Sequence, residues 1–392
     1  MNLSWQSVPL KQALKRVARF ESREDINEYV FAGTYSFGRG VFVSERKLGA
    51  TFKLPKVQRL RAGDFVYCKI MAWEGAFGIV PPEADDCVMS NAFVAYEADS
   101  SVVDPKFLDW YFRAPSNWQR IGRQSTGTNV RRQSLHPEQF EASEIPLPPL
   151  GEQRRIVARI EKLAARVQEA QQARLRAVNE LSALHTKLLL STFDSVSNSS
   201  TEIGAEFVVT TGGTPSRANS SYWGGSNAWV SSGEVAFRDI IDTREKITDL
   251  GLRESNAKIY PPGTVLLAMI GQGKTRGQCA ILQCAAATNQ NVAAIHVTKT
   301  IHSPRYVYWW LYANYRKSRS TETGTAQPAL SADRVKRMLI PLPERNRQDQ
   351  IASQLEALQS KFDAVKALQA QSAIELDALL PAVLDKAFKG EL

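Results

Sequence analysis

One stretch of the sequence satisfies the loose form of a phosphate-binding loop. Residues 268–275 read Ala-Met-Ile-Gly-Gln-Gly-Lys-Thr. Such a loop needs a strand before it and a helix after it, because amides at the helix N-terminus hold the phosphates. Residues 264–270 fit a buried strand, but residues 278–282 form a second short apolar run without a helical period. The sequence therefore favours a hairpin, and an NTPase is the alternative.

The tip of this hairpin carries side chains that suit a DNA surface. Residues 271–277 hold three glycines and two cations, and glycines let a backbone approach a ligand closely. Arg, Lys, Asn and Gln can present paired donors to base edges in the major groove. We predict DNA contacts from Gln272, Lys274, Thr275 and Arg276.

Two Thr-Gly-Thr sequences, at 126–128 and 323–325, add further candidates for DNA contact. Polar and cationic side chains follow both of them. The predicted set comprises Asn129, Arg131, Arg132 and Gln133 after the first, Gln327 after the second, and Arg39 and Arg46 nearer the N-terminus.

The charge of the chain favours a polyanionic partner. The net charge is +9, and residues 200–340 hold 16 Lys and Arg against 10 Asp and Glu. Much of the excess lies late in each half of the chain, including Arg113, Arg120 and Arg123 in the first half. The globular parts are therefore where DNA is expected to dock.

The cysteines and the apolar runs bear on the compartment. The four cysteines lie far from paired histidines, so neither a zinc site nor a disulfide framework is indicated, which fits a reduced cytoplasm. No apolar run approaches about 18 residues, so we expect no membrane insertion. We expect no cofactor and no metal.

An internal repeat organises the chain. The segment Ile-Pro-Leu-Pro that begins at Ile145 returns at Ile340, and the offset of 195 residues holds through Phe193 and Phe388. Upstream, residues 104–114 resemble residues 303–313. The length of 392 residues also exceeds one ordinary domain. We predict globular units at 1–144 and 195–339, and helical spacers at 145–194 and 340–392.

Each spacer has apolar residues at alternating four- and three-residue spacing, which is typical of a coiled coil. We expect Pro381 to kink the second helix or to start a new one. The predicted seam comprises Ile156, Ile160, Leu163, Val167, Leu181, Leu184 and Leu188 in the first helix, and Ile351, Leu355, Leu358, Phe362, Val365, Leu376 and Leu379 in the second.

The chain order predicts how these helices pair. The second globular unit begins where the first helix ends and finishes where the second helix begins, and a compact domain often keeps its termini close. Antiparallel helices satisfy that condition. The predicted fold is therefore α+β, with two mixed α/β units, an antiparallel coiled coil and an approximate twofold repeat.

These features together resemble the specificity subunit of type I restriction-modification systems over essentially the whole chain. The resemblance rests on the duplicated Ile-Pro-Leu-Pro helical segments, the closing residues 386–392, and residues 211–235 with 323–331. The first unit lacks the Gly-Gly-Thr-Pro opening of the second, so the resemblance is weaker there.

The resemblance implies a non-catalytic cytoplasmic protein that binds double-stranded DNA. Two target recognition domains each read one half of a split asymmetric site. The helices hold them apart and dock two modification subunits, which are methyltransferases that bind S-adenosylmethionine. Restriction subunits, which are ATP-dependent translocases and nucleases, join the same complex.

Enzyme signatures in the chain itself are weak. The Pro-Pro pairs at 81–82 and 261–262 stand in contexts unsuited to an amino-methyltransferase loop, and the four histidines form no visible triad. A coiled-coil adaptor that ignores DNA is the other alternative.

Overall fold

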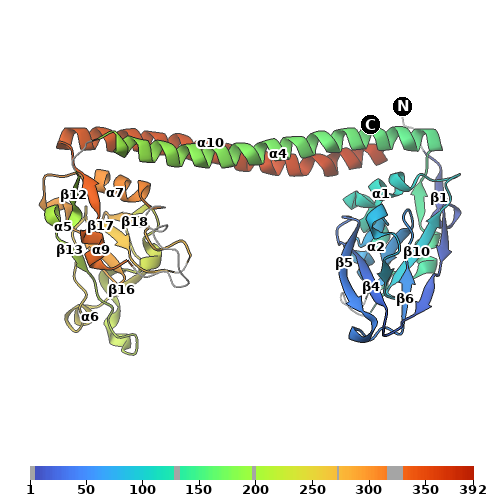
Figure 1. Ribbon diagram of the computed structural model, residues 1–392, viewed down its shortest axis with the longest axis horizontal. Coiled ribbons are helices and arrows are strands. Elements are labelled where there is room, and N and C mark those ends of the chain that lie inside the picture. The colour runs from blue at the N-terminus through green and yellow to red at the C-terminus, as the bar shows by residue number, and fades with distance from the viewer. Residues whose placement is uncertain (1–4, 128–132, 197–199, 272, 316–329) are drawn as a thin grey trace. The chain divides into compact units, whose positions relative to one another are not determined.

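The computed structural model describes residues 5–127, 133–196, 200–271, 273–315 and 330–392, and it divides into two compact units (Figure 1). Unit 1 comprises Met1–Leu175 with Ala370–Leu392, and unit 2 comprises Arg176–Gln369. Two long helices, α4 (Leu150–Asp194) and α10 (Arg345–Phe388), each contribute one portion to each unit. The predicted α+β class with long helices is confirmed.

Among the described residues, the globular part of unit 1 contains a two-stranded sheet, two larger sheets and three short α-helices. One larger sheet has the antiparallel order β2-β10-β7-β8, and the other has the order β3-β6-β9-β4-β5, with β4 parallel to β9. The elements are β1 (Ser7–Pro9), β2 (Leu14–Val17), β3 (Phe20–Ser22), β4 (Glu28–Thr34), β5 (Val41–Leu48), β6 (Lys56–Arg59), β7 (Phe65–Cys68), β8 (Phe77–Ile79), β9 (Val88–Met89), β10 (Phe93–Ala98), α1 (Pro105–Arg113), α2 (Pro115–Gly122), α3 (Pro137–Ala142) and β11 (Glu144–Pro146).

In the described part of unit 2, the globular part likewise contains a two-stranded sheet and two larger sheets. The orders of the larger sheets are β13-β20-β17-β18-β15 and β16-β14-β19. The elements are β12 (Ser200–Glu202), α5 (Ile203–Glu206), β13 (Val209–Thr211), β14 (Trp223–Val230), β15 (Arg238–Ile240), β16 (Glu245–Ile247), α6 (Asp249–Arg253), β17 (Val265–Ala268), β18 (Cys279–Leu282), β19 (Ala286–Thr288), β20 (Val292–Ile295), α7 (Pro304–Ala313), α9 (Ala332–Lys336) and β21 (Leu339–Pro341).

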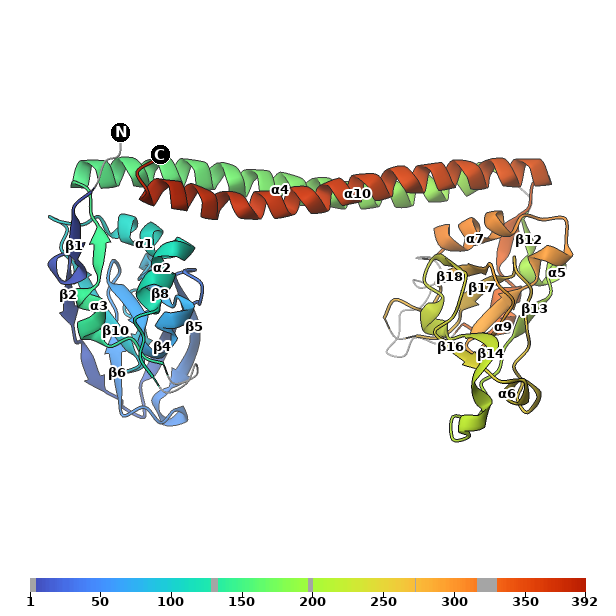
Figure 2. The same ribbon diagram turned by 180° about the vertical axis from the view of Figure 1, so that it is seen from behind.

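The internal repeat is present in the fold as well as in the sequence. Strands β2-β10-β7-β8 of unit 1 have the same order and antiparallel pairing as β13-β20-β17-β18 of unit 2. Helices α1 and α7 occupy the matching place, between the sheets of each unit and the long helices (Figure 2). Each unit therefore contains the same hairpin, β7–β8 or β17–β18, beside the same helix.

The Ile-Pro-Leu-Pro segments begin as strands, whereas the sequence predicted that they open the helical spacers. Ile145 of β11 is paired with Val8 of β1, and Ile340 of β21 is paired with Thr201 of β12. Both pairs are antiparallel. The segments therefore join the first and last strands of each globular part, and the helix starts a few residues later.

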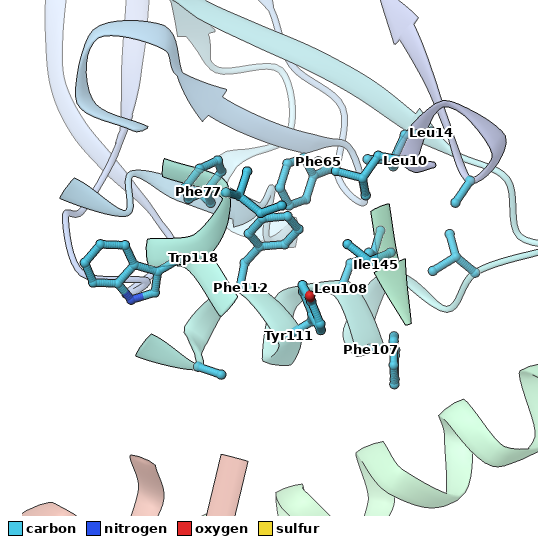
Figure 3. Packing of buried hydrophobic residues seen from close by; sticks show 14 of the residues in the cluster. Leu10, Leu14, Phe65, Phe77, Phe107, Leu108, Tyr111, Phe112, Trp118 and Ile145 are labelled. Carbon is cyan, nitrogen blue, oxygen red and sulfur yellow. The ribbon is translucent and has the colours of Figure 1, made fainter. Parts of the chain in front are cut away.

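An aromatic cluster connects the sheet of unit 1 to the long helices through α1. On one face of α1, Phe112 lies 4.8 Å from Phe65 and 4.9 Å from Phe77, measured between ring centroids (Figure 3). On another, Phe107 lies 5.4 Å from Phe388 of α10. Unit 2 repeats the second contact, because Tyr306 of α7 lies 5.5 Å from Phe193 of α4.

The two long helices pair in antiparallel directions. In unit 1, Ile156 and Ile160 near the start of α4 share a core with Leu384 near the end of α10. In unit 2, Leu189 near the end of α4 shares a core with Ile351 near the start of α10. Helix α10 continues through Pro381 to Phe388, so no new helix starts there.

The predicted seam is wrong at three positions. Leu184 and Leu379 are 49% and 46% exposed, and Val365 is also exposed. In unit 2 His185 is buried where Leu184 was expected to be. In unit 1 Leu380 packs against the core where Leu379 was expected to do so. Since each of these follows its exposed leucine by one residue, the buried face is displaced by one position at equivalent points of the repeat.

This displacement predicts a difference between neighbouring alanine variants. Leu380→Ala removes a side chain packed against the core, and we expect it to cost about 2 kcal/mol of unfolding free energy. Leu379→Ala alters an exposed position and is expected to stay within about 0.5 kcal/mol of wild type. Urea unfolding of both variants measures the difference. Equal losses would restore the seam predicted from the sequence.

Candidate nucleic-acid interface

The β17–β18 hairpin has the form that the sequence favoured over a phosphate-binding loop. Val265 is paired with Ile281 and Leu267 with Cys279 in antiparallel register. Because strand β18 follows the tip, no helix N-terminus faces the position where a phosphate would lie. Gly273 and Gly277 at the tip have φ of 91° and 85°, a region that favours glycine. The geometry therefore gives no support to the NTPase alternative.

The predicted DNA contacts on this tip differ in exposure. The Lys274 side chain is exposed, and its backbone carbonyl accepts a hydrogen bond from the Tyr315 hydroxyl at 2.6 Å. Thr275 is half-buried. Arg276 is only 5% exposed, so its guanidinium is not presented to a groove and the prediction for it is revised. Gln272 lies outside the described residues.

Leu330, which follows the second Thr-Gly-Thr sequence, contacts the hairpin. The Leu330 amide donates to the Met269 carbonyl at 3.0 Å, where the tip begins. The matching contact in unit 1 joins the Leu135 amide to the Lys69 carbonyl at 2.9 Å. Lys69–Glu74 is a 3-10 turn between β7 and β8, so it occupies the place of the β17–β18 tip. Gln327 lies outside the described residues.

Thr126 of the first Thr-Gly-Thr sequence is joined to Ser134 by two backbone hydrogen bonds. The Thr126 amide donates to Ser134 O at 3.0 Å, and the Ser134 amide donates to Thr126 O at 2.9 Å. Gln133, which is half-buried, precedes this closure. Asn129, Arg131 and Arg132 lie outside the described residues.

Arg39 and Arg46 both lie on the surface of unit 1, but their charges are held differently. Arg39 donates from Nε to the Ser36 carbonyl at 3.1 Å, and its guanidinium lies 5.0 Å from the Tyr35 ring centroid. Arg46 forms a 3.0 Å ion pair with Glu28. Because Arg46 is already paired with a carboxylate, Arg39 is the better candidate for a phosphate contact.

Two other cations that the sequence suggested for DNA serve the fold. The Arg113 Nε is 2.8 Å from an Asp109 carboxylate oxygen. Arg120 donates to the Tyr111 hydroxyl at 2.7 Å and to the Glu144 carbonyl at 2.8 Å. Their hydrogen bonds connect α1, α2 and β11, which a composition count cannot distinguish from a phosphate contact.

The sequence reasoning missed an isoleucine that each unit exposes at the hairpin tip. Ile70 is 54% exposed and Ile270 is 45% exposed. Each is one residue beyond the carbonyl, of Lys69 or Met269, that accepts the Leu135 or Leu330 amide. Each follows a buried strand, β7 or β17, but their equivalence is visible only in the fold, through the Leu135 and Leu330 amides, so sequence spacing could not identify it. Our candidate DNA interface in unit 1 is the β7–β8 tip with Thr126, Ser134 and Arg39, and in unit 2 it is the β17–β18 tip with Lys274.

Comparison with known proteins finds similarity to one family over part of the chain. Residues 203–375 match the family model described as the type I restriction modification DNA specificity domain. The type I restriction enzyme MjaIX specificity subunit of Methanocaldococcus jannaschii is 29% identical over 151 residues. Over this region the chain is similar to type I restriction-modification specificity subunits. The aligned part covers 37% of the chain and 34% of that relative, which is about a third of its length.

Solved structures share the fold over the whole chain. A chain from a type I R-M system, solved to explain complex assembly and conformational transition, has a TM-score of 0.76 at 22% identity. It covers 100% of this chain and 99% of its own. The HsdS subunit from Thermoanaerobacter tengcongensis has a TM-score of 0.67 at 21% identity, covering 100% and 98%. At these identities the likeness concerns the fold alone.

The family-like opening of unit 2 has a structural role. The Trp229 indole donates to the Gly213 carbonyl at 3.0 Å, and the Gly213 amide donates to the Thr288 carbonyl at 2.9 Å. Arg217 lies 3.7 Å from the Trp223 ring centroid and forms an ion pair with Glu245, which lowers the pKa of that carboxyl. These contacts therefore stabilise the part of unit 2 around strand β14.

Within the described part of the chain, no group of three or more His, Cys, Asp or Glu side chains is placed to hold a metal ion. No described helix is both long and apolar enough to cross a bilayer. Burial raises the pKa of the Cys279 thiol well above its ordinary value, which makes it a poor nucleophile.

His185 makes the stability of unit 2 depend on pH. Burial and the nearby Lys366 lower the pKa of His185 below its ordinary value of 6.5, although Gln359 and Asp363 oppose them. The folded state then binds fewer protons than the unfolded state, so stability falls as pH drops through 6.5.

We expect unit 2 to melt at a lower temperature at pH 5 than at pH 7.5. The variant His185→Leu, which introduces the residue found at the matching Leu380, should weaken this dependence. Burial also lowers the pKa of His296, so part of the dependence should remain. Calorimetry at both pH values measures it. An unchanged slope in His185→Leu would contradict the assignment.

Proposed function

We propose that the chain is the non-catalytic, DNA-reading subunit of a type I restriction-modification complex, and that each unit reads one half of a split site. The observation that carries this proposal is the repeated hairpin with unlike tips. Both units present a tip beside an equivalent leucine, yet unit 1 has residues 69–75 of sequence Lys-Ile-Met-Ala-Trp-Glu-Gly where unit 2 has the glycine-rich tip. Unlike tips favour unlike half-sites, whereas identical units would favour a palindrome.

We also propose that two methyltransferase subunits dock on the long helices. Leu184 in unit 2 and Leu379 in unit 1 are equivalent by the repeat, and both are exposed. Two equivalent apolar positions suit two copies of one partner. The partners would bind S-adenosylmethionine and supply the methylation chemistry. Restriction subunits would complete the nuclease in the cytoplasm.

Methylation mapping tests the reading function directly. The chain is expressed with its methyltransferase partner in a host that lacks both, and modified bases are located across the genome. We expect a motif of two unlike half-sites separated by a constant gap. A continuous palindrome would contradict the two-unit proposal. New methylation without any common motif would favour an adaptor that ignores DNA sequence.

Lys274 should contribute a phosphate contact to the second half-site. Lys274→Ala is expected to weaken DNA binding several-fold and to reduce the slope of log affinity against log salt by about one. The measurement is titration of the complete methyltransferase complex at several salt concentrations. Lys258→Ala, which removes another exposed cation of unit 2, is the control. Equal slopes for both variants would remove Lys274 from the interface.

A further inference from the structure

A buried glutamine fastens the first long helix to the globular part of unit 1. Gln153 lies in the first turn of α4 and is fully buried. Its Oε1 accepts a hydrogen bond from the Asp104 amide at 2.8 Å. Its Nε2 donates to the Val102 carbonyl at 3.0 Å and to the Pro148 carbonyl at 2.8 Å. The side-chain amide therefore joins three parts of the backbone around the start of α1 and α4.

Unit 2 contains an equivalent buried glutamine 195 residues later. Gln348 is fully buried in the first turns of α10. Its Oε1 accepts from the Ser303 amide at 2.9 Å, and its Nε2 donates to the Pro343 carbonyl at 2.7 Å. The same Nε2 lies 2.8 Å from His302 Nδ1. Asp104 and Ser303 are the N-cap residues of α1 and α7, so both glutamines hold the same helix start.

Further ion pairs join each long helix to the short helix of its own unit, α4 to α1 and α10 to α7. The Lys106 Nζ is 2.8 Å from Glu161 of α4, and the Arg305 Nε is 3.0 Å from Glu356 of α10. These pairs are equivalent in the repeat. The Lys106–Glu161 pair is exposed to solvent and the Arg305–Glu356 pair is partly exposed, so neither is strong on its own. A buried amide with all of its partners in place has a single geometry, because leaving one unpaired is costly.

From these contacts we infer that Gln153 and Gln348 are positioning residues that set the gap between the half-sites. This inference rests on the proposed reading of a split site by the two units. Each base pair added to a gap lengthens the duplex by about 3.4 Å and rotates the next half-site about its axis. A globular part that is held rigidly at the start of its long helix cannot adjust to a changed gap. One that is held loosely can tilt toward the displaced half-site. The glutamines thereby act on gap selectivity, while the hairpin tips act on base selectivity.

Binding to duplexes of different gap length tests the inference. The full chain, in complex with its methyltransferase partner, is titrated with DNA that carries the mapped half-sites and the natural gap, or a gap one base pair longer or shorter. The readout is the ratio of affinities for natural and altered gaps. We expect Gln153→Ala and Gln348→Ala each to lower this ratio by about tenfold, equivalent to one buried hydrogen bond. Selectivity for the bases of each half-site should not change.

Controls separate positioning from a general loss of structure. Gln168→Ala replaces an exposed glutamine of α4 and should keep the wild-type ratio. A purely structural role would lower affinity for all gaps equally and leave the ratio unchanged, which would overturn the inference. If Gln153→Ala does not fold, Gln153→Met is used, because it keeps the side-chain volume and removes the hydrogen bonds to the Asp104 amide and to the two carbonyls. It should lower the ratio too.

Failure of the two proposals can be told apart. If the wild-type complex has no gap preference, the split-site function is wrong. If the wild type prefers one gap and the folded glutamine variants retain that preference, only the positioning role is wrong.

Discussion

Phe388→Ala is expected to remove roughly 3–5 kcal/mol from the stability of unit 1. The ring is nearly buried and stands edge-on to Phe107 at 5.4 Å and to Tyr111 at 5.2 Å. Alanine would lose these contacts and leave a cavity between α10 and α1. Because Phe107 belongs to the core that reaches Leu10 and Phe65, the loss should spread through the unit.

The repeat supplies a matched experiment for this variant. Phe193→Ala removes the equivalent ring in unit 2, where it contacts Tyr306 at 5.5 Å. We expect Phe388→Ala to reduce hydrogen-exchange protection in α1, and Phe193→Ala to reduce it in α7. Protection measured by mass spectrometry distinguishes the two. Loss in the opposite unit, or no loss in either, would contradict the packing described above.

The architecture was largely predictable because the two copies of the repeat mark equivalent elements in the two halves of the chain. Ile145 with Ile340 and Phe193 with Phe388 marked equivalent ends, and antiparallel pairing followed from the order of the parts. The β17–β18 hairpin was also predictable, since an apolar run without helical period after the tip excludes a following helix. The boundaries of the four segments remain predictions.

The seam could not be extrapolated along the whole helix. A strict alternation of four and three residues assumes 3.5 residues per turn, but a straight helix has 3.6 and drifts by about 20° per heptad. Starting from Ile156, the pattern reaches Leu184 after four heptads, by which point the buried face has moved to His185. A polar residue at that place further hid the displacement from a search for apolar spacing.

The candidate interface was only partly predictable, because exposure depends on tertiary contacts. Lys274 and Arg276 are cations two residues apart on one tip, yet the first is exposed and the second is buried. Spacing along the sequence does not distinguish them. The glutamine pair could be recognised in the sequence, because Gln153 and Gln348 are identical residues at equivalent positions of the repeat. Nothing in their side-chain type, however, indicates that they are buried.

Gly212→Ala is expected to cost unit 2 about 3 kcal/mol or more, at the upper end for overpacking a core. A Cβ at this position would lie 1.9 Å from the Thr288 carbonyl oxygen and 2.3 Å from its hydroxyl oxygen. The obstacle is largely backbone, because the same carbonyl accepts the Gly213 amide, so β19 would have to separate from residues 212–213. Unit 1 shares none of these contacts.

The consequence for DNA reading should be confined to one half-site. In the methyltransferase complex, Gly212→Ala should lose selectivity for the half-site read by unit 2 and keep selectivity for the other, which methylation of mixed half-site duplexes measures. Gly233→Ala is the matched control, since its Cβ would meet nothing nearer than 4.0 Å. A folded Gly212→Ala variant with full selectivity at both half-sites would show that the glycine is not required. Selectivity lost at both would mean that the two units do not read DNA independently.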